Sequence, residues 1–236
     1  MQPTLELTHV QFSWPQQPEL LLNIPQLQLA AGECLFLHGP SGSGKTTLLG
    51  LLSGIQKPTQ GRICILGQDL SQRSAGARDH FRADHTGYIF QQFNLLPFLS
   101  VQENVELSCR FSKRRAQRAQ QQHGSQGQAA KHLLQHLGLP SPLWSQRADS
   151  LSVGQQQRVA AARALIGQPE LIIADEPTSA LDADSRAAFL ELLFSECQAV
   201  QASLLFVSHD LSLAPLFQRS LSLPELNQAH PVVGAC

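Results

Sequence analysis

The 236-residue sequence lacks long apolar runs, a strong charge of one sign and a pattern of paired cysteines. No window approaches the roughly 18 consecutive apolar residues of a membrane-spanning helix, and the N-terminal segment lacks the charged-then-apolar order of a secretory signal. The formal net charge of −1 provides no basic surface of the kind that binds nucleic acid. We therefore expect a soluble chain that neither crosses a membrane nor binds nucleic acid.

The cysteines and histidines give no sign of a disulfide or a metal site. Cysteines stand at positions 34, 64, 109, 197 and 236 without a C-x-x-C spacing, and their odd number favours reduced cytosolic thiols. His132 and His136 are four residues apart on an expected helix, but no acidic residue lies between them. This pattern favours exposed helix histidines over a metal site.

One polar stretch is predicted to stay outside the core. Residues 114 to 128 are rich in glutamine and contain glycine, which predicts a mobile loop or a frayed helix. The basic cluster Lys113, Arg114, Arg115 and Arg118 is interpreted as a solvated helix face rather than a lipid or RNA contact. A helical pattern resumes at residues 129 to 137, before the stop signals Gly138 and Pro140.

A glycine-rich segment is the first positive indication of function. Residues 39 to 47 read GPSGSGKTT and fit the pattern G-x-x-x-x-G-K-[ST], between an apolar run at 34 to 37 and a helical pattern. Glycines let successive backbone N–H groups turn inward around phosphate oxygens, and the helix adds the positive end of its dipole. The segment predicts a strand, a phosphate-binding loop and a helix. Lys45 would reach the β- and γ-phosphates of a nucleotide, and Thr46 would offer its hydroxyl to Mg²⁺.

The segment LIIADEPTSALD at residues 171 to 182 supplies carboxylates for the same chemistry. Residues 171 to 174 have the composition of a buried parallel strand, and ligands in open α/β sheets bind at the carboxyl ends of such strands. Asp175 is suited to hold Mg²⁺, directly or through water. Glu176 is placed to polarise a water against the γ-phosphate.

Together with a third segment between them, these sequences resemble the ATP-binding subunits of ABC transporters. LSVGQQQR at residues 151 to 158 is similar to the family signature LSGGQ, although Val153 stands where the family more commonly has glycine. Apolar residues with helical spacing predict a helix that begins beside Ser152. The resemblance implies that Ser152 and Gly154 contact the γ-phosphate of ATP bound by a second subunit.

Other positions continue the resemblance along nearly the whole chain. Gln91 matches the glutamine whose loop senses Mg²⁺ and touches the membrane partner, and His209 resembles the switch histidine near the γ-phosphate. Residues 179 to 182 resemble the loop that communicates across the dimer. Trp14 stands where the family usually places an aromatic that stacks on adenine, with packing on the core as the alternative.

The resemblance and the motifs together define three sets of candidate residues. The catalytic set is Lys45, Gln91, Glu176 and His209, and the Mg²⁺ ligands are Thr46, Gln91 and Asp175. The nucleotide contacts are Trp14, Gly39, Pro40, Ser41, Gly42, Ser43, Gly44, Lys45, Thr46, Thr47, Ser152 and Gly154.

The resemblance implies an α/β fold, in which a P-loop NTPase core with a mostly parallel sheet carries an antiparallel N-terminal β part and a helical insert subdomain. We expect one domain over residues 1 to 236, with the core at 1–91 and 166–225 and the insert at about 92–165. A hydrophobic content of 42% is enough to bury a sizeable core in a chain of this length.

The implied function is ATP hydrolysis that powers movement of a substrate across or out of a membrane. ATP and Mg²⁺ are the implied cofactors, and the partners are a second copy in a head-to-tail dimer and a separate integral membrane permease. The chain would then be cytoplasmic and peripheral on the inner face of the cell membrane. The alternative is a non-transporting ABC ATPase that regulates a membrane complex or acts in DNA repair or translation.

A more specific likeness concerns the branch of the family. The run at residues 87 to 97 and the following segment at 100 to 105 look most like the lipoprotein-release and macrolide-efflux branch. That branch places a helix of its membrane partner near the Gln91 loop. Nearby apolar residues predict the contact surface, with ordinary core packing as the alternative: Phe93, Leu95, Leu96 and Phe98.

Overall fold

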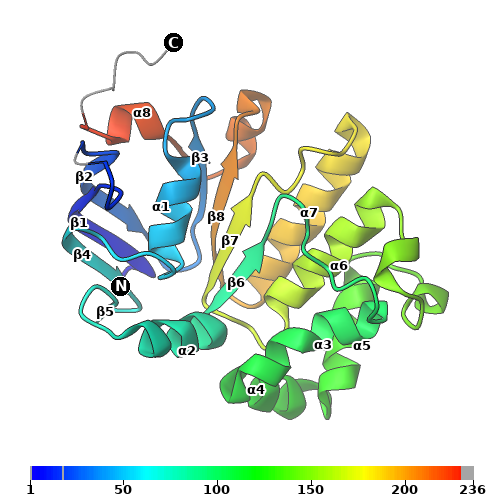
Figure 1. Ribbon diagram of the computed structural model, residues 1–236. Helices are drawn as coiled ribbons and strands as arrows, with labels where there is room; N and C mark the ends of the chain where they lie inside the picture. The colour runs from blue at the N-terminus through cyan, green and yellow to red at the C-terminus, as the bar shows by residue number, and fades with distance from the viewer. Residues whose placement is uncertain (1, 18, 230–236) are drawn as a thin grey trace.

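The computed structural model describes residues 2–17 and 19–229, and its strands form two sheets (Figure 1). The strands are β1 (Leu5–Phe12), β2 (Leu22–Leu29), β3 (Cys34–His38), β4 (Gln60–Ile65), β5 (Gln68–Asp69), β6 (Thr86–Ile89), β7 (Leu171–Asp175), β8 (Ser203–Ser208) and β9 (Arg219–Ser222). The antiparallel sheet has the order β2-β1-β4-β5, and the parallel sheet has the order β6-β7-β8-β3-β9. The α/β fold with an antiparallel N-terminal part is therefore confirmed.

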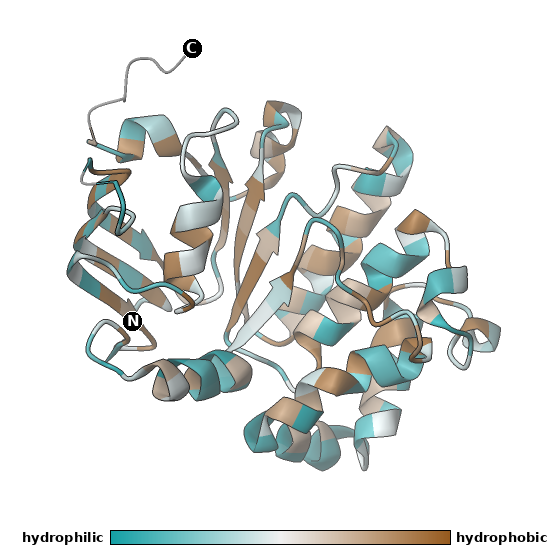
Figure 2. Ribbon diagram, viewed as in Figure 1, coloured by the Kyte–Doolittle hydropathy of each residue, from teal (hydrophilic) through white to brown (hydrophobic). Residues whose placement is uncertain are grey.

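Strands β7 and β8 form the buried centre of the parallel sheet. They pair in register, with Ile172 opposite Leu204 and Ile173 opposite Leu205. All four of these side chains are fully buried, and β8 is coloured as hydrophobic along most of its length in Figure 2. Near-continuous apolar runs are typical of strands that are covered on both faces, as was expected for residues 171 to 174.

The two faces of this sheet enter different hydrophobic cores. Along β7, Ile172 and Ala174 join the core shared with the helical region, whereas Leu171 and Ile173 join the core shared with the antiparallel sheet. The period of two follows from the alternation of side chains along a strand. The parallel sheet is thus the layer that connects the two halves of the molecule.

The described helices divide between the two sides of the parallel sheet. They are α1 (Lys45–Leu52), α2 (Ala75–His85), α3 (Val101–Phe111), α4 (Lys113–His123), α5 (Gln126–His136), α6 (Val153–Leu165), α7 (Ala183–Ala199) and α8 (Leu223–Leu226), with 3₁₀ segments at Ser141–Leu143, Ala148–Ser150 and Leu211–Leu216. Helices α3 to α6 fall inside the predicted insert and gather on the side away from the antiparallel sheet (Figure 1). The predicted domain limits at 1 and 236 lie outside the described residues and stay a prediction.

No helix in the described ranges combines the length and the apolar content that a membrane span requires.

The prediction of a mobile loop or frayed helix at residues 114 to 128 is wrong. Helices α4 and α5 occupy this stretch, and each begins at a serine cap. The hydroxyl of Ser112 accepts from the N–H of Arg115 at 3.0 Å, and that of Ser125 accepts from the N–H of Gln128 at 3.1 Å. Gly124 ends α4 with a left-handed φ of 79°. These caps satisfy terminal N–H groups, so local hydrogen bonding outweighs the polar composition.

The interpretation of the basic cluster as a solvated face is also wrong for most of its members. Arg115 is only 3% exposed and donates to three backbone carbonyls at the end of α6, at 2.7 to 3.1 Å. Arg114 and Arg118 both bind the carboxylate of Glu170, at 2.8 and 2.9 Å. Only Lys113 is fully on the surface. A cation at the C-terminus of α6 meets carbonyls that lack helical partners, which explains its burial.

Candidate functional site

The predicted strand, loop and helix at residues 34 to 52 are present as β3, the phosphate loop (residues 39–44) and α1. Gly42 and Gly44 have left-handed φ angles of 79° and 95°, which residues with a Cβ rarely adopt. A Cβ on Gly39 would come within 2.8 Å of the Ser43 hydroxyl oxygen. The backbone is therefore closely wound, and the glycines are needed for that conformation.

Lys45 lies in a cleft of about 400 Å³ that brings most of the predicted phosphate and metal residues together. Its Nζ donates to the carbonyls of Gly39 at 2.8 Å and Pro40 at 3.0 Å. We call this the phosphate-loop cleft; the predicted residues that line it are Ser41, Gly42, Gly44, Lys45, Thr46, Thr47, Gln91, Asp175 and Glu176.

The polar groups of this cleft fit a nucleotide phosphate and its Mg²⁺. The hydroxyl of Ser43, in the phosphate loop but outside the lining of this cleft, is buried and has no hydrogen-bond partner among the described residues. Thr46, Gln91 and Asp175 present a hydroxyl, an amide and a carboxylate to the same space, and oxygen ligands are those that Mg²⁺ prefers. The described residues contain no group of three His, Cys, Asp or Glu arranged for a metal. The set in this cleft differs because only one of its three side chains, Asp175, belongs to those residue types.

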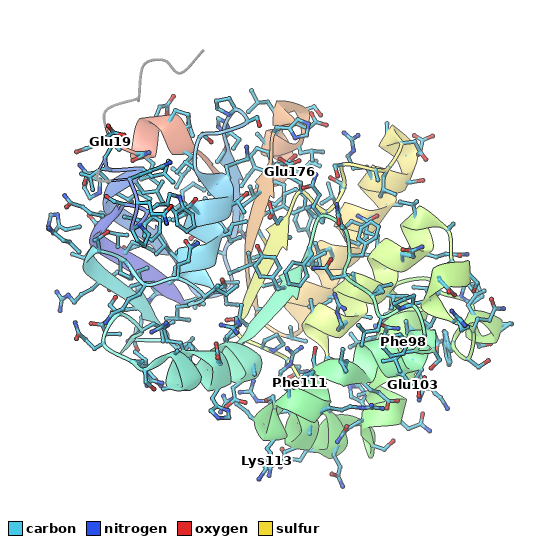
Figure 3. All side chains as sticks on the ribbon, in the orientation of Figure 1. Glu19, Phe98, Glu103, Phe111, Lys113 and Glu176 are labelled. Atoms are coloured by element: carbon cyan, nitrogen blue, oxygen red, sulfur yellow. The ribbon has the colours of Figure 1, made fainter. Side chains whose placement is uncertain are left out.

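The carboxylates of Asp175 and Glu176 stand where β7 ends, and Glu176 is labelled in the upper part of the molecule in Figure 3. Burial and the neighbouring Glu176 raise the pKa of Asp175, while the charge of Lys45 acts in the opposite direction. Glu176 has a left-handed φ of 44°, and its N–H donates to the carbonyl of Val207 at 2.8 Å. Its carboxylate contacts Nδ1 of His209 at 3.0 Å. The predicted catalytic acid and switch histidine are therefore in direct contact within one chain.

Ser152 forms the N-terminus of α6, as the apolar spacing predicted. Its hydroxyl accepts from the N–H of Gln155 at 3.4 Å, and its own N–H donates to the Gln155 side chain at 3.0 Å, which makes a capping box. Val153, the departure from the family signature, is 46% exposed.

Ser152 and Gly154 line a second cleft, which we call the signature cleft. It is lined by Gly138, Pro140, Ser152, Gly154, Gln155, Gln157, Arg158, Leu181, Ser185 and Phe189. Its lining residues and those of the phosphate-loop cleft do not overlap. One chain thus keeps the two predicted halves of the ATP site apart, while Leu181 places the 179 to 182 loop beside the signature.

Trp14 lies outside both clefts. The side chain is 40% exposed and meets the ring of Phe12 edge-on, with the ring centres 5.1 Å apart. The indole is thus supported by Phe12 while part of the ring stays accessible. Its contact with adenine stays a prediction.

The apolar residues after Gln91 do not form one surface. Phe93 is buried in the core, whereas Phe98 is 67% exposed (Figure 3). A different cleft, of about 530 Å³, lies between α2, β6 and α3; we call it the apolar cleft. Among its lining residues are Phe90, next to Gln91, and Phe111, which is 70% exposed at the end of α3. Leu96 and Phe98 do not line it.

The histidines and cysteines were predicted to form neither a metal site nor disulfides. The ring of His132 packs against that of His136 at a tilt of 44°, and Nδ1 of His136 contacts the carboxylate of Glu196 at 3.0 Å. Both histidines thus have partners at the surface of α5. The thiols described are free, at positions 34, 64, 109 and 197. Position 236 lies outside the described residues.

Sequence reasoning missed Arg163, which lies within α6. This guanidinium is 8% exposed and donates to the carbonyls of Phe93 and Asn94, in the turn at residues 91–94 that we call the Gln91 turn. The available signal was one charged residue inside an apolar stretch at 159 to 166, a position where arginine is rarely buried without a partner.

Comparison with known proteins gives consistent matches. A family model described as ABC transporter matches residues 22–179. The uncharacterised ABC transporter ATP-binding protein YbbA of Escherichia coli K12 is 41% identical over 198 residues, which is 84% of this chain and 83% of that protein. The lipoprotein-releasing system ATP-binding protein LolD of Shewanella sp. MR-7 is 39% identical, covering 84% of this chain and 82% of that protein. The macrolide export protein MacB of Shigella flexneri is 37% identical over 94% of this chain and 33% of its own length.

A solved structure agrees in both fold and sequence. The dimeric post-hydrolysis state of the ATP-binding cassette MJ0796 bound to ADP and Pi superposes with a TM-score of 0.80. The alignment has 32% identity and covers 92% of this chain and 93% of that one.

Proposed function

The chain belongs to the ABC transporter family, and from that premise we propose how its own residues divide ATP hydrolysis between two copies. It is an ATP-hydrolysing subunit that pairs with a second copy and powers transport through a separate membrane subunit. The predicted likeness to the lipoprotein-release and macrolide-efflux branch is confirmed, because LolD and MacB are among its relatives.

The observation that carries the proposal is the separation of the phosphate-loop cleft from the signature cleft. Within one chain, Lys45 and Ser152 serve different spaces, so neither cleft alone surrounds a triphosphate. A head-to-tail pair of chains would place the signature cleft of one copy against the phosphate-loop cleft of the other. Each ATP would then lie between two sets of donors.

The phosphate loop holds the phosphates with its N–H groups and with the N-terminus of α1. Lys45 exchanges the carbonyls of Gly39 and Pro40 for the β- and γ-phosphate oxygens, which are stronger acceptors because they are charged. Trp14 supports the adenine, and Ser152 and Gly154 of the second copy donate to the γ-phosphate. The two copies thus share one nucleotide.

Thr46, Gln91 and Asp175 would hold Mg²⁺ beside the phosphates. When bound, this ion supplies positive charge that neutralises the developing charge on the phosphate oxygens. The same charge favours the ionised carboxylate of Asp175, which burial disfavours in the free chain.

Glu176 acts on the water, and His209 acts on Glu176. The Glu176 carboxylate accepts a proton from the attacking water, while the contact from His209 fixes the orientation of that carboxylate. The left-handed backbone at Glu176 further restricts where the side chain can point. ATP bound between two chains then favours the closed dimer, because both chains contact its γ-phosphate. Loss of the γ-phosphate removes these contacts.

Glu176→Gln tests this proposal. The amide keeps the shape of the side chain but cannot accept the proton, so we expect a stable ATP-bound dimer with little turnover. Light scattering after size exclusion, with and without ATP and Mg²⁺, measures the dimer. A chain that stays monomeric at saturating ATP would contradict the shared site.

We also propose that the membrane subunit places an apolar helix in the apolar cleft, which makes the chain peripheral on the inner face of the membrane. Phe90 and Phe111 line this cleft, and Phe90 directly precedes Gln91, so docking there lies next to the Mg²⁺ site. The predicted residues Leu96 and Phe98 lie outside it, which moves the proposed contact toward Phe111.

Two exposed phenylalanines give a matched test of the docking site. We expect Phe111→Glu to lose the multi-span membrane protein that co-purifies with tagged Glu176→Gln chain from detergent-solubilised source cells. Phe98→Glu, on a residue of similar exposure outside the cleft, should retain it. Equal retention by both variants would overturn this location.

A further inference from the structure

Arg163 makes unusual contacts for a buried charged residue. It is 8% exposed, and its side chain donates to backbone carbonyls: Nη1 to Asn94 at 2.6 Å and Nη2 to Phe93 at 2.5 Å. Burial lowers its pKa to about 10. A buried cation is stabilised only when its donors are satisfied, so these two carbonyls are essential partners of the guanidinium.

The accepting residues form a strained turn directly after Gln91. Phe93 and Asn94 have left-handed φ angles of 58° and 50°. This region is disfavoured for phenylalanine and better tolerated by asparagine, and two successive non-glycine residues rarely occupy it. The turn is closed by the N–H of Phe93 on the carbonyl of Phe90 and by that of Asn94 on Gln92. Such a conformation persists only when the surroundings hold it, and the fork of Arg163 supplies two charged hydrogen bonds to it.

The far end of the same loop is held separately. Asn104 of α3 is fully buried, and its amide accepts from the N–H of Leu96 at 2.8 Å and donates to the Leu96 carbonyl at 3.0 Å. The end near Leu96 therefore depends on α3. The end near Gln91 depends on Arg163, and therefore on α6.

Arg163 also shares a helix with the signature and a cleft with the proposed docking site. It lies on α6, the helix that begins at the Ser152 cap, and it lines the apolar cleft together with Phe90 and Phe111. A movement of α6, or an apolar helix placed in that cleft, therefore reaches the Gln91 turn through the same side chain.

We propose that Arg163 is a positioning residue that holds the Gln91 turn against α6, so that Gln91 points into the phosphate-loop cleft and follows the signature helix. This inference rests on the proposed role of Gln91 at the Mg²⁺ site, and it names Arg163 as the residue that keeps Gln91 in position there. Arginine suits this role because its planar guanidinium donates to two carbonyls at once, whereas lysine carries the same charge without the fork.

Arg115 provides a matched control. It is also buried, also on a helix of the insert, and also donates to backbone carbonyls, that of Thr86 and those at the end of α6, including the main-chain carbonyl of Arg163. Among the described residues, its side chain makes no hydrogen bond with residues 90 to 96. Arg115→Lys therefore removes a comparable set of guanidinium hydrogen bonds and should leave the Gln91 turn in place.

The first test follows amide hydrogen exchange in the protein without nucleotide or Mg²⁺, below the unfolding temperature of every variant. We expect Arg163→Lys to accelerate exchange at residues 91–96 about tenfold, because the strained turn opens more often. Arg115→Lys should leave that segment as in the wild type. If both variants accelerate it equally, or neither does, the proposal is overturned.

The second test separates an effect on Mg²⁺ binding from an effect on nucleotide binding. We expect Arg163→Lys to raise the Mg²⁺ concentration for half-maximal ATPase activity about tenfold, as loss of an outer support of a metal ligand does. Nucleotide affinity in EDTA should stay within about twofold of the wild type. In a double-mutant cycle, Arg163→Lys should add almost nothing to Gln91→Ala, because both act on one ligand. Additive effects would overturn the proposal.

These outcomes are distinguishable from a failure of the proposed function. A wild-type chain without ATP turnover would refute the proposed function and leave the exchange result as a statement about the loop. Normal turnover together with unchanged exchange at residues 91–96 would refute only the role of Arg163.

Discussion

The phosphate-loop cleft and the signature cleft are built on different physical bases. In the first, charged groups already have partners: Lys45 binds loop carbonyls, and Glu176 contacts His209. In the second, Gln157 is completely buried, and neither its amide nitrogen nor its amide oxygen has a partner among the described residues. The charged groups of the first cleft are thus paired within one chain, with one unpartnered hydroxyl nearby at Ser43, whereas the second cleft contains a whole amide group without a partner among the described residues.

This difference suggests a division of labour. A cleft whose charged groups are already held in place can bind nucleotide before the copies meet, with Lys45 exchanging two loop carbonyls for phosphate oxygens. A cleft with an unpaired buried amide becomes fully satisfied only when water or a further polar group enters it. Three changes would break or sharpen the contrast.

The largest effect is expected for Ser152→Ala. Loss of the donor to the second copy should reduce turnover on the order of 10²-fold, while nucleotide affinity of the single chain stays within about twofold. Loss of the helix cap should also cost about 1 kcal/mol of unfolding free energy. Steady-state kinetics, nucleotide titration and urea unfolding measure the three quantities.

Ser125→Ala controls for the cap alone. Ser125 caps α5 in the same way but lines neither cleft, so it should lower stability by a similar amount and leave turnover unchanged. If both alanine variants lose turnover equally, the signature cleft contributes nothing specific.

A smaller, pH-dependent effect is expected in the phosphate-loop cleft. Burial and Glu176 raise the pKa of Asp175, so the folded chain binds this proton more tightly than the unfolded chain does. As pH falls through the folded pKa, the contribution of Asp175 to the unfolding free energy therefore rises, while Mg²⁺ binding weakens because the ligand is neutralised. Thermal unfolding and Mg²⁺ titration across the acidic range test both signs.

Asp175→Asn should remove both pH trends, because the amide does not titrate. Ser152→Ala should leave them as in the wild type, since Ser152 lies in the other cleft. A pH trend that persists in Asp175→Asn would assign it to another group.

The smallest effect is expected for Gln157→Leu. Replacing an unpaired buried amide by an apolar group of similar size should raise the unfolding free energy by about 1 kcal/mol. Gln156→Leu, which removes a satisfied bond to the Leu151 carbonyl, should not stabilise the chain. Urea unfolding compares the two, and a loss of stability in Gln157→Leu would mean that this amide is satisfied by water.

Local pattern was enough to predict much of the site. The glycine loop with Lys45 and the strand that ends at Asp175 both follow from residues adjacent in sequence, because one strand and one turn fix their geometry. Ser152 followed from the spacing of the helix after it. The structural places of these residues were therefore predictable, whereas their individual roles rest on proposals.

The errors concern arginines whose partners are distant in sequence. Arg115 and Arg163 are buried because they meet carbonyls about 50 and 70 residues away, and composition carries no information about such contacts. The stretch at 114 to 128 was misjudged by its glutamine content, although Ser112 and Gly124 were visible as cap residues. Burial of charge is a tertiary property, so a pattern along the chain does not reveal it.

The alternation of β7 between two cores has a consequence for how the sequence can change over evolution. Inserting or deleting one residue in this strand would send every following side chain to the opposite core and would displace Asp175 and Glu176 together. The same change near Gly124, between two surface helices, would alter only a connection. We therefore expect homologues to vary in length around Gly124 and to keep the length of β7 constant. An alignment of such sequences can then start from this strand.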